Sequence, residues 1–127
     1  MKEERVAGTW QKGNKQVTLS IQVWVFEEDG YTHVFSPQLN VVGAGMTEED
    51  AFTSFRQTLG MFLEYTTNKG TFFNELKKLG WEIKKQSKPY KAPAFDHLLK
   101  SNETFKHLVQ RGDYRVSHET VTVPAYA

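Results

Sequence analysis

The sequence predicts an α+β domain: an antiparallel sheet of three to four strands, one long helix packed on it, and a C-terminal helix–strand extension. Three observations lead to this class. Apolar and polar residues alternate with period two from residue 17 to 25, as in a strand with one buried face. A hairpin signal and further strand-like segments follow at once. Apolar residues then recur every three or four positions between residues 51 and 63, as on one face of a helix.

The composition limits the class of protein. A chain of 127 residues with 39% hydrophobic and 24% charged residues is long enough for one domain with a buried core. The chain has no cysteine, which excludes a disulfide scaffold, a thiolate zinc site and a thiol nucleophile. The first residues are charged, unlike a signal peptide, and no apolar run reaches the roughly 20 residues of a membrane span. We therefore expect a cytoplasmic protein that does not associate with membranes.

The main domain is expected at residues 16–85, after a flexible arm at residues 1–15. Asp29-Gly30 supplies the positive φ of a tight hairpin between the first strand and a second one at residues 31–36. Pro37 ends the second strand, because proline has no N–H to donate to a ladder. A third strand is predicted at residues 39–44, which completes a meander.

Thr47 is the predicted N-cap of the long helix, with acidic residues in the first turn where the helix dipole favours negative charge. The helix should end near Gly70, and a shorter helix and a brief strand should follow. Residues 86–127 read as a linker and a helix–strand extension, packed on the same domain or exchanged with a second copy. The apolar pattern slips in phase along the last strand, which predicts a bulge or turn near His118 and Glu119.

Two glycines before the long helix raise the question of phosphate binding. Gly43 and Gly45 lack the third glycine of a dinucleotide fingerprint and the Gly-Lys pair of a P-loop. Acidic residues at the helix start would also repel an anion. These glycines therefore indicate a tight corner between strand and helix.

The residues give no support for catalysis or for a cofactor. None of the four histidines shows the i, i+4 pairing of a helical metal site. The acidic groups at residues 27–29 and 48–50 are explained as a hairpin turn and a helix N-terminus. No Gly-x-Ser-x-Gly elbow is present. We predict a protein that is not an enzyme, with no catalytic residue, no metal ligand and no cofactor.

Two surfaces are candidates for partners. Aromatic residues on the first two strands make both faces apolar, so one face either binds a partner or lies under the C-terminal helix; the residues are Trp24, Phe26, Tyr31, His33 and Phe35. A lysine-rich stretch between residues 77 and 91 is either a solvated face or a basic patch for nucleic acid; the residues are Lys77, Lys78, Lys84, Lys85, Lys88 and Lys91.

The order of motifs resembles the HicB-like antitoxin family, which has a reduced ribonuclease-H-like fold. An Asp-Gly-Tyr hairpin, a Ser-Pro-Gln-Leu segment and Gly-Met-Thr-Glu-Glu-Asp-Ala at the helix start occur in the family's order over residues 17–84. The matching residues are Asp29, Gly30, Tyr31, Pro37, Leu39, Gly45, Thr47, Glu49 and Ala51. Gln38 stands where the family usually has Asp, and residues 40–42 replace its Pro-Gly-Cys.

The resemblance implies a non-enzymatic protein-binding module whose partner is a small RNA-cleaving toxin. It also leaves room for a solitary relative, because residues 93–127 do not read as the DNA-binding domain that antitoxins of this family usually carry. The alternatives are a nucleic-acid-associated regulator that uses the lysine-rich stretch and a degenerate nuclease. We further expect a homo-oligomer, most simply a dimer formed through an exposed sheet edge or face.

Overall fold

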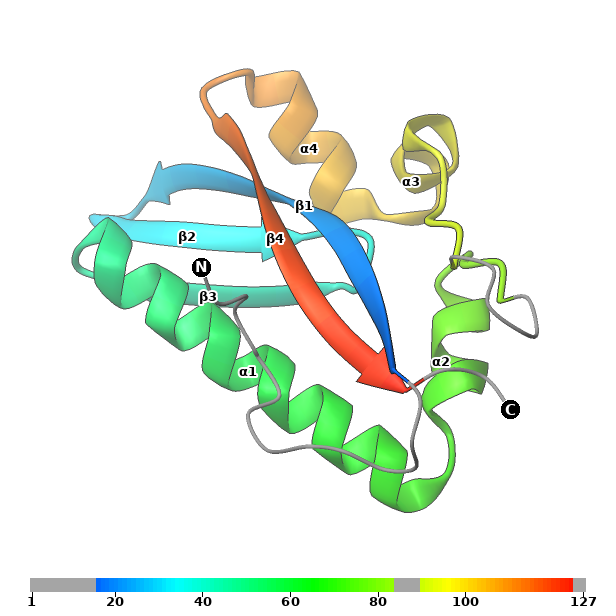
Figure 1. Cartoon of the computed structure of the whole chain (residues 1–127). Helices are drawn as coiled ribbons and strands as arrows, with labels where there is room; N and C mark the ends of the chain where they lie inside the picture. The colour runs from blue at the N-terminus through cyan, green and yellow to red at the C-terminus, as the bar shows by residue number, and fades with distance from the viewer. Residues whose placement is uncertain (1–15, 84–89, 125–127) are drawn as a thin grey trace.

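The computed structural model describes residues 16–83 and 90–124 and confirms the predicted α+β class. An antiparallel sheet in the order β3-β2-β1-β4 lies between helices on its two faces (Figure 1). The predicted arm at residues 1–15 lies outside the described residues. The strands are β1 Gln16–Glu28, β2 Tyr31–Ser36, β3 Val41–Gly45 and β4 Arg115–Pro124, and the helices are α1 Glu48–Lys69, α2 Phe72–Lys78, α3 Phe95–Ser101 and α4 Glu103–Arg111.

The long strand β1 lies at the centre of the sheet. Its last residues pair with β2 across the predicted hairpin, where Asp29 and Gly30 have φ values of 55° and 82°. Its other edge pairs with β4 from Gln16 to Val25. β2 does not extend far enough to pair with Gln22. The backbone N–H of Gln22 instead donates to Oε1 of Gln38 at 2.8 Å, so a side chain supplies the acceptor that a strand would otherwise provide.

The third strand begins later than predicted. It spans Val41–Gly45 instead of residues 39–44, because residues 37–40 form a turn in which Asn40 has a φ of 55°. Leu39 points into the core from this turn and is 2% exposed. Its apolar character therefore reflects burial and not strand pairing.

The corner between β3 and α1 requires its glycines for close approach of two backbones. A Cβ atom at Gly43 would lie 2.2 Å from the backbone nitrogen of Phe55, and one at Gly45 would lie 2.7 Å from the nitrogen of Ala51. Thr47 caps the helix as predicted, since its hydroxyl accepts the N–H of Asp50 at 3.1 Å. The glycine pair thus seats α1 directly on the edge of the sheet.

One apolar layer fills the space between the sheet, α1 and α2. Residues 19, 21, 23 and 25 of β1 point to this face, as the alternation in sequence predicts. The side chain of Arg56 on α1 also reaches Glu119 on β4 at 3.3 Å, which ties the helix to the far strand. The helical members of the layer are Ala51, Phe55, Leu59, Leu63, Phe72 and Leu76.

The opposite face of the sheet is covered by the C-terminal helices, so three of the five aromatic residues predicted as a partner surface are unavailable. Trp24, Phe26 and Phe35 pack against α3 and α4 in a second apolar layer. Trp24 meets Phe105 edge to face, with ring centroids 4.8 Å apart. The alternative reading, in which the C-terminal helix covers this face, is the one that the structure supports.

The predicted bulge in the last strand is wrong. β4 pairs with β1 without interruption from Arg115 to Pro124. The phase of the apolar pattern slips because β4 contributes to both layers. Tyr114, the residue just before β4, packs on the α4 side and Val116 pairs with Trp24, whereas Val121 and Val123 are fully buried on the α1 side.

Substitution of Gly43 by alanine should lower the free energy of unfolding by about 1–3 kcal/mol or more, because α1 must move away from β3 to admit the methyl group. Urea denaturation followed by circular dichroism measures the change. Val42→Thr on the same strand is the control, since Val42 is 49% exposed; its effect should stay within about 0.5 kcal/mol. Equal stability of Gly43→Ala and the wild type would contradict the close packing.

Substitution of Phe105 by alanine should destabilise the protein by about 3–5 kcal/mol, because a fully buried ring is removed from the second layer. It should also shift tryptophan fluorescence to longer wavelength as water reaches Trp24. Thr104→Ala, an exposed neighbour on the same helix, is the matched control. A variant that keeps both its stability and its emission maximum would show that α4 does not cover Trp24 in solution.

Candidate functional site

An acidic hollow of about 520 Å³ lies at one end of the sheet. It is lined by residues of the C-terminal part of β1, the start of α1 and the loop between α4 and β4. These segments are far apart in sequence and are brought together by the β1–β4 pairing and by the β3–α1 corner. The hollow is lined by Val25, Phe26, Glu27, Thr32, Met46, Thr47, Glu48, Asp113, Tyr114 and Arg115.

Carboxylates from three separate elements surround the hollow. Glu27 comes from β1, Glu48 from the first turn of α1 and Asp113 from the loop before β4. The hydroxyl of Thr32 donates to Oε2 of Glu27 at 3.0 Å, and Arg115 pairs with Glu48 across the opening. These contacts hold the carboxylates in place while leaving them accessible to a ligand.

Arg111 contacts two of the acidic segments, the loop that holds Asp113 and the end of β1. It donates to both carboxylate oxygens of Asp113, at 3.0 and 3.1 Å, and to the backbone oxygen of Glu27 at 2.9 Å. Its guanidinium also lies over the ring of Phe26, 5.3 Å from the centroid, and within 3.4 Å of a carboxylate oxygen of Glu28. One arginine thereby joins the end of α4 to the β1–β2 hairpin.

The hydrogen bond from Arg111 lowers the pKa of the Asp113 carboxyl below its ordinary value. The same hydrogen bond raises the pKa of Arg111. Both groups are charged near neutral pH, so the contact between them is an ion pair at the surface.

Further acidic and apolar side chains adjoin the hollow. Asp29 in the hairpin and Glu49 and Asp50 in the first turn of α1 are also exposed, next in sequence to segments that line the hollow. Met46 in the lining is 71% exposed, and Tyr31 at the start of β2 is 47% exposed. An exposed methionine beside carboxylates that are partly neutralised by Arg115 is more typical of a protein-binding surface than of a site for a free ion.

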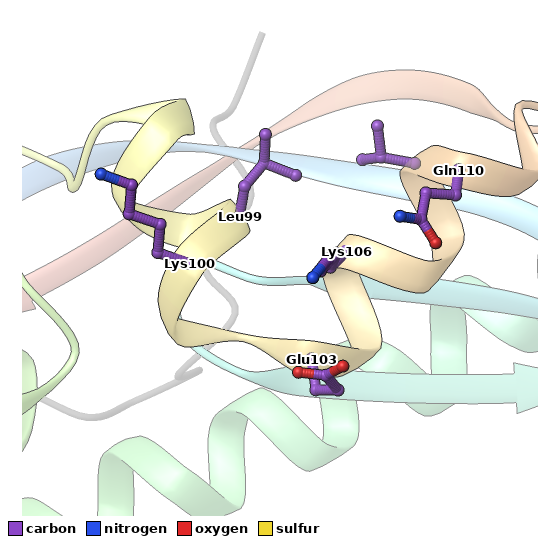
Figure 2. A pocket seen from close by; sticks show the side chains of 6 residues that line it. Leu99, Lys100, Glu103, Lys106 and Gln110 are labelled. Carbon is purple, nitrogen blue, oxygen red and sulfur yellow. The ribbon is translucent and has the colours of Figure 1, made fainter.

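A second hollow of about 510 Å³ lies between α3 and α4 (Figure 2). Leu99 and Val109 supply its apolar part, and Lys100, Glu103 and Lys106 surround them. Leu99 and Val109 also pack against the second apolar layer. The mixed charges around this second hollow favour no particular class of ligand.

The family-motif residues have structural roles wherever their contacts are visible. Asp29 and Gly30 form the hairpin turn, and Gly45 and Thr47 form the corner between β3 and α1. Ala51 lies on the buried side of α1. Pro37 and Leu39 are buried, whereas Glu49 is exposed. Gln38, where the family has Asp, also accepts the indole N–H of Trp81 through its backbone oxygen at 2.8 Å.

The remaining predicted partner residues are distributed over two regions. His33 is half-buried, and its ring stacks on Phe26 with centroids 5.1 Å apart. Lys77, Lys78 and Lys91 are exposed, and Lys78 forms an ion pair with Glu75 at 3.5 Å. The other lysines of the predicted basic patch, Lys84, Lys85 and Lys88, lie outside the described residues.

Within residues 16–83 and 90–124, no three His, Cys, Asp or Glu side chains are grouped so as to hold a metal ion. No helix in those ranges is long and apolar enough to cross a membrane. Comparison with models of known families, with curated proteins and with solved structures found no significant match. The resemblance to HicB-like antitoxins therefore rests on the sequence motifs alone.

Sequence reasoning did not find the hollow, because it assigned each acidic group a local role. Those roles are real, but the fold places residues 27–29, 48–50 and 113 at the same end of the molecule. The available signal was the charge asymmetry, since acidic residues predominate in the first half of the chain and basic residues in the second.

The Asp113 carboxyl should titrate below the ordinary aspartate pKa of about 3.9. Because its folded pKa is lowered, the stability from its ion pair is present above that ordinary value and is lost as the pH falls through the folded pKa. Carboxyl NMR titration measures this. Arg111→Met should return the pKa of Asp113 to the ordinary range, whereas Arg115→Gln should leave it low. An Asp113 pKa that Arg111→Met does not change would contradict the assigned contact.

Proposed function

We propose that this protein is a non-enzymatic protein-binding module resembling HicB-type antitoxins, and that its acidic hollow receives a small, basic, RNA-cleaving protein. The observation that supports the proposal most directly is the meeting of three carboxylates and an exposed methionine in one hollow. The family resemblance supplies the class of partner, and the charge of the hollow agrees with it.

Charge complementarity links the two arguments. A protein that binds RNA must contact a phosphate backbone and therefore carries basic side chains on its active surface. Carboxylates at the hollow would attract that surface and compete with RNA for it. Binding would then block the partner by covering it, without any chemical step on the part of this protein.

The internal arginines make the site selective. Arg111 and Arg115 already neutralise part of the negative charge through Asp113 and Glu48. A partner therefore needs basic groups that approach the remaining carboxylate oxygens, with an apolar side chain opposite Met46 to displace water. A nucleic acid is negatively charged, as the carboxylates of the hollow are, so the hollow would repel it.

Neutralising the hollow should weaken the binding of a small basic RNA-cleaving protein that is isolated with this chain from its host by about tenfold or more. The variant is Glu27→Gln, Glu48→Gln and Asp113→Asn together. Each lost ion pair is assumed to contribute roughly 0.5 kcal/mol, about 1.5 kcal/mol in total. Isothermal titration calorimetry at several salt concentrations gives both the affinity and its salt dependence.

The control variant removes the same charge elsewhere, through Glu64→Gln, Glu75→Gln and Glu82→Gln. It should bind as the wild type does, and circular dichroism should show that both variants are folded. Equal weakening in both would exclude the hollow as the binding site. Recovery of RNA, with no small basic protein, when the tagged chain is isolated from its host would favour the nucleic-acid alternative.

A further inference from the structure

Two arginines lie at the acidic hollow, and the fold holds them very differently. Arg111 donates to both carboxylate oxygens of Asp113 and to the backbone oxygen of Glu27, and its side chain is 34% exposed. The side chain of Arg115 is 56% exposed, and within the described part of the chain its guanidinium has one hydrogen-bond partner, Glu48. Arg111 is therefore a fixed part of the structure, whereas the contact between Arg115 and Glu48 is open to exchange with a ligand.

The register of the sheet places Arg115 on the same face as two of the carboxylates. Arg115 lies opposite Val25, which is buried in the apolar layer beneath α1. Directly opposite side chains, and side chains two residues apart on one strand, point to the same face of a sheet. Arg115 and Glu27 therefore share the α1 face at the end of the sheet, and Glu48 lies in the first turn of α1. All three side chains line the hollow.

The contact between Arg115 and Glu48 uses only part of the carboxylate. Nη2 of Arg115 donates to Oε2 of Glu48, and among the described residues Oε1 of Glu48 has no hydrogen-bond donor. A guanidinium that approaches a carboxylate freely can bond both oxygens in parallel, and such a bidentate pair is stronger than a single contact. Ion pairs between exposed side chains also contribute little to stability. A second arginine can therefore bind Glu48 better than Arg115 does and displace it with little effect on the fold.

Glu27 provides a second position for a cation in the same hollow. Its carboxylate accepts the hydroxyl of Thr32 at 3.0 Å, and no cation among the residues that the structure describes forms an ion pair with it. Its negative charge is therefore not neutralised by that part of the chain. A ligand with two basic side chains can place one at Glu27 and the other at Glu48, with an apolar side chain against Met46.

We propose that Arg115 occupies, in the free protein, the position that an arginine of the protein partner takes in the complex, and that the partner's arginine displaces Arg115 from Glu48. The inference rests on the proposed function, because it concerns the same hollow. Arg115 then acts as an internal competitor. It weakens the binding of every cation at Glu48, so a ligand needs a guanidinium at this carboxylate and further contacts at Glu27 and Met46 to bind.

A blocked peptide with one leucine between two arginines is a probe that does not require the natural partner. Arg115→Gln removes the internal competitor, so the dissociation constant of this peptide should fall by about two- to fivefold. The side-chain carboxyl carbon of Glu48, followed by NMR during the titration, reports binding at that residue. Lys69→Gln is the matched control, because it removes the same charge at the other end of α1, roughly 30 Å from Glu48. It should leave the dissociation constant nearly unchanged.

The preference for arginine gives a second test. In the Arg115→Gln variant, a peptide with lysines in place of the arginines should bind several-fold more weakly, because an ammonium group cannot form two parallel hydrogen bonds with both oxygens of Glu48. Glu48→Gln in the same background should remove this preference. Circular dichroism should show that all variants are folded, since each substitution changes an exposed side chain.

Three results would overturn the proposal: a wild-type protein that binds the arginine peptide as tightly as Arg115→Gln does, an equal gain in Lys69→Gln, or no change at Glu48 when the peptide is added to Arg115→Gln. Equal affinities of Arg115→Gln for the arginine and lysine peptides would also overturn it.

The exchange of arginines and the proposed function can fail separately. If Arg115→Gln gains no affinity for the arginine peptide but the triple substitution at Glu27, Glu48 and Asp113 weakens binding of the RNA-cleaving protein, the function stands without the exchange. If the peptide binds Arg115→Gln more tightly but no small basic protein is isolated with the chain, the competition at Glu48 stands and the RNA-cleaving partner is rejected.

Discussion

Both faces of β1 carry apolar side chains, and the rest of the structure depends on covering them. Residues 19 to 25 at odd positions require α1 and α2 on one side, while Trp24 and Phe26 require α4 on the other. A strand that is apolar on both faces also has to be central, with neighbours on both edges. β2 supplies one neighbour and β4 the other, although β4 lies at the far end of the sequence.

Much of this arrangement is predictable from local signals. Asp29-Gly30 specifies the hairpin, Thr47 caps α1, and the period of three and four identifies the buried side of that helix. These signals depend only on residues that are close in sequence, so they predict the local structure without knowledge of the rest of the fold. Predictions that depend on distant contacts were less successful. The apolar character of Leu39 wrongly predicts a strand, and the slip near His118 wrongly predicts a bulge because the sequence does not show that the two ends of this segment serve different apolar layers.

The acidic hollow illustrates the same limit for function. Glu27 and Glu48 each have an adequate local explanation, and only the fold places Asp113 beside them. Arg111 joins the loop before β4 to the β1–β2 hairpin through Asp113, Glu28 and the backbone of Glu27, while Arg115 holds Glu48. The side chains that organise the hollow are therefore also among those that join α4 to the hairpin. The charges that line the hollow therefore also contribute to the packing of the fold.

The pairing of β1 with β4 has a consequence for how the chain folds. The first and last described residues, Gln16 and Pro124, are partners in one ladder, so the pairing of the central strand is complete only after synthesis has passed Pro124. Until then, β1 keeps one unsatisfied edge, and Trp24 and Phe26 remain without their covering helix. Contacts of such long sequence separation slow folding and leave apolar surface exposed on the ribosome. The nascent chain should therefore be a good substrate for the chaperones that bind extended apolar segments.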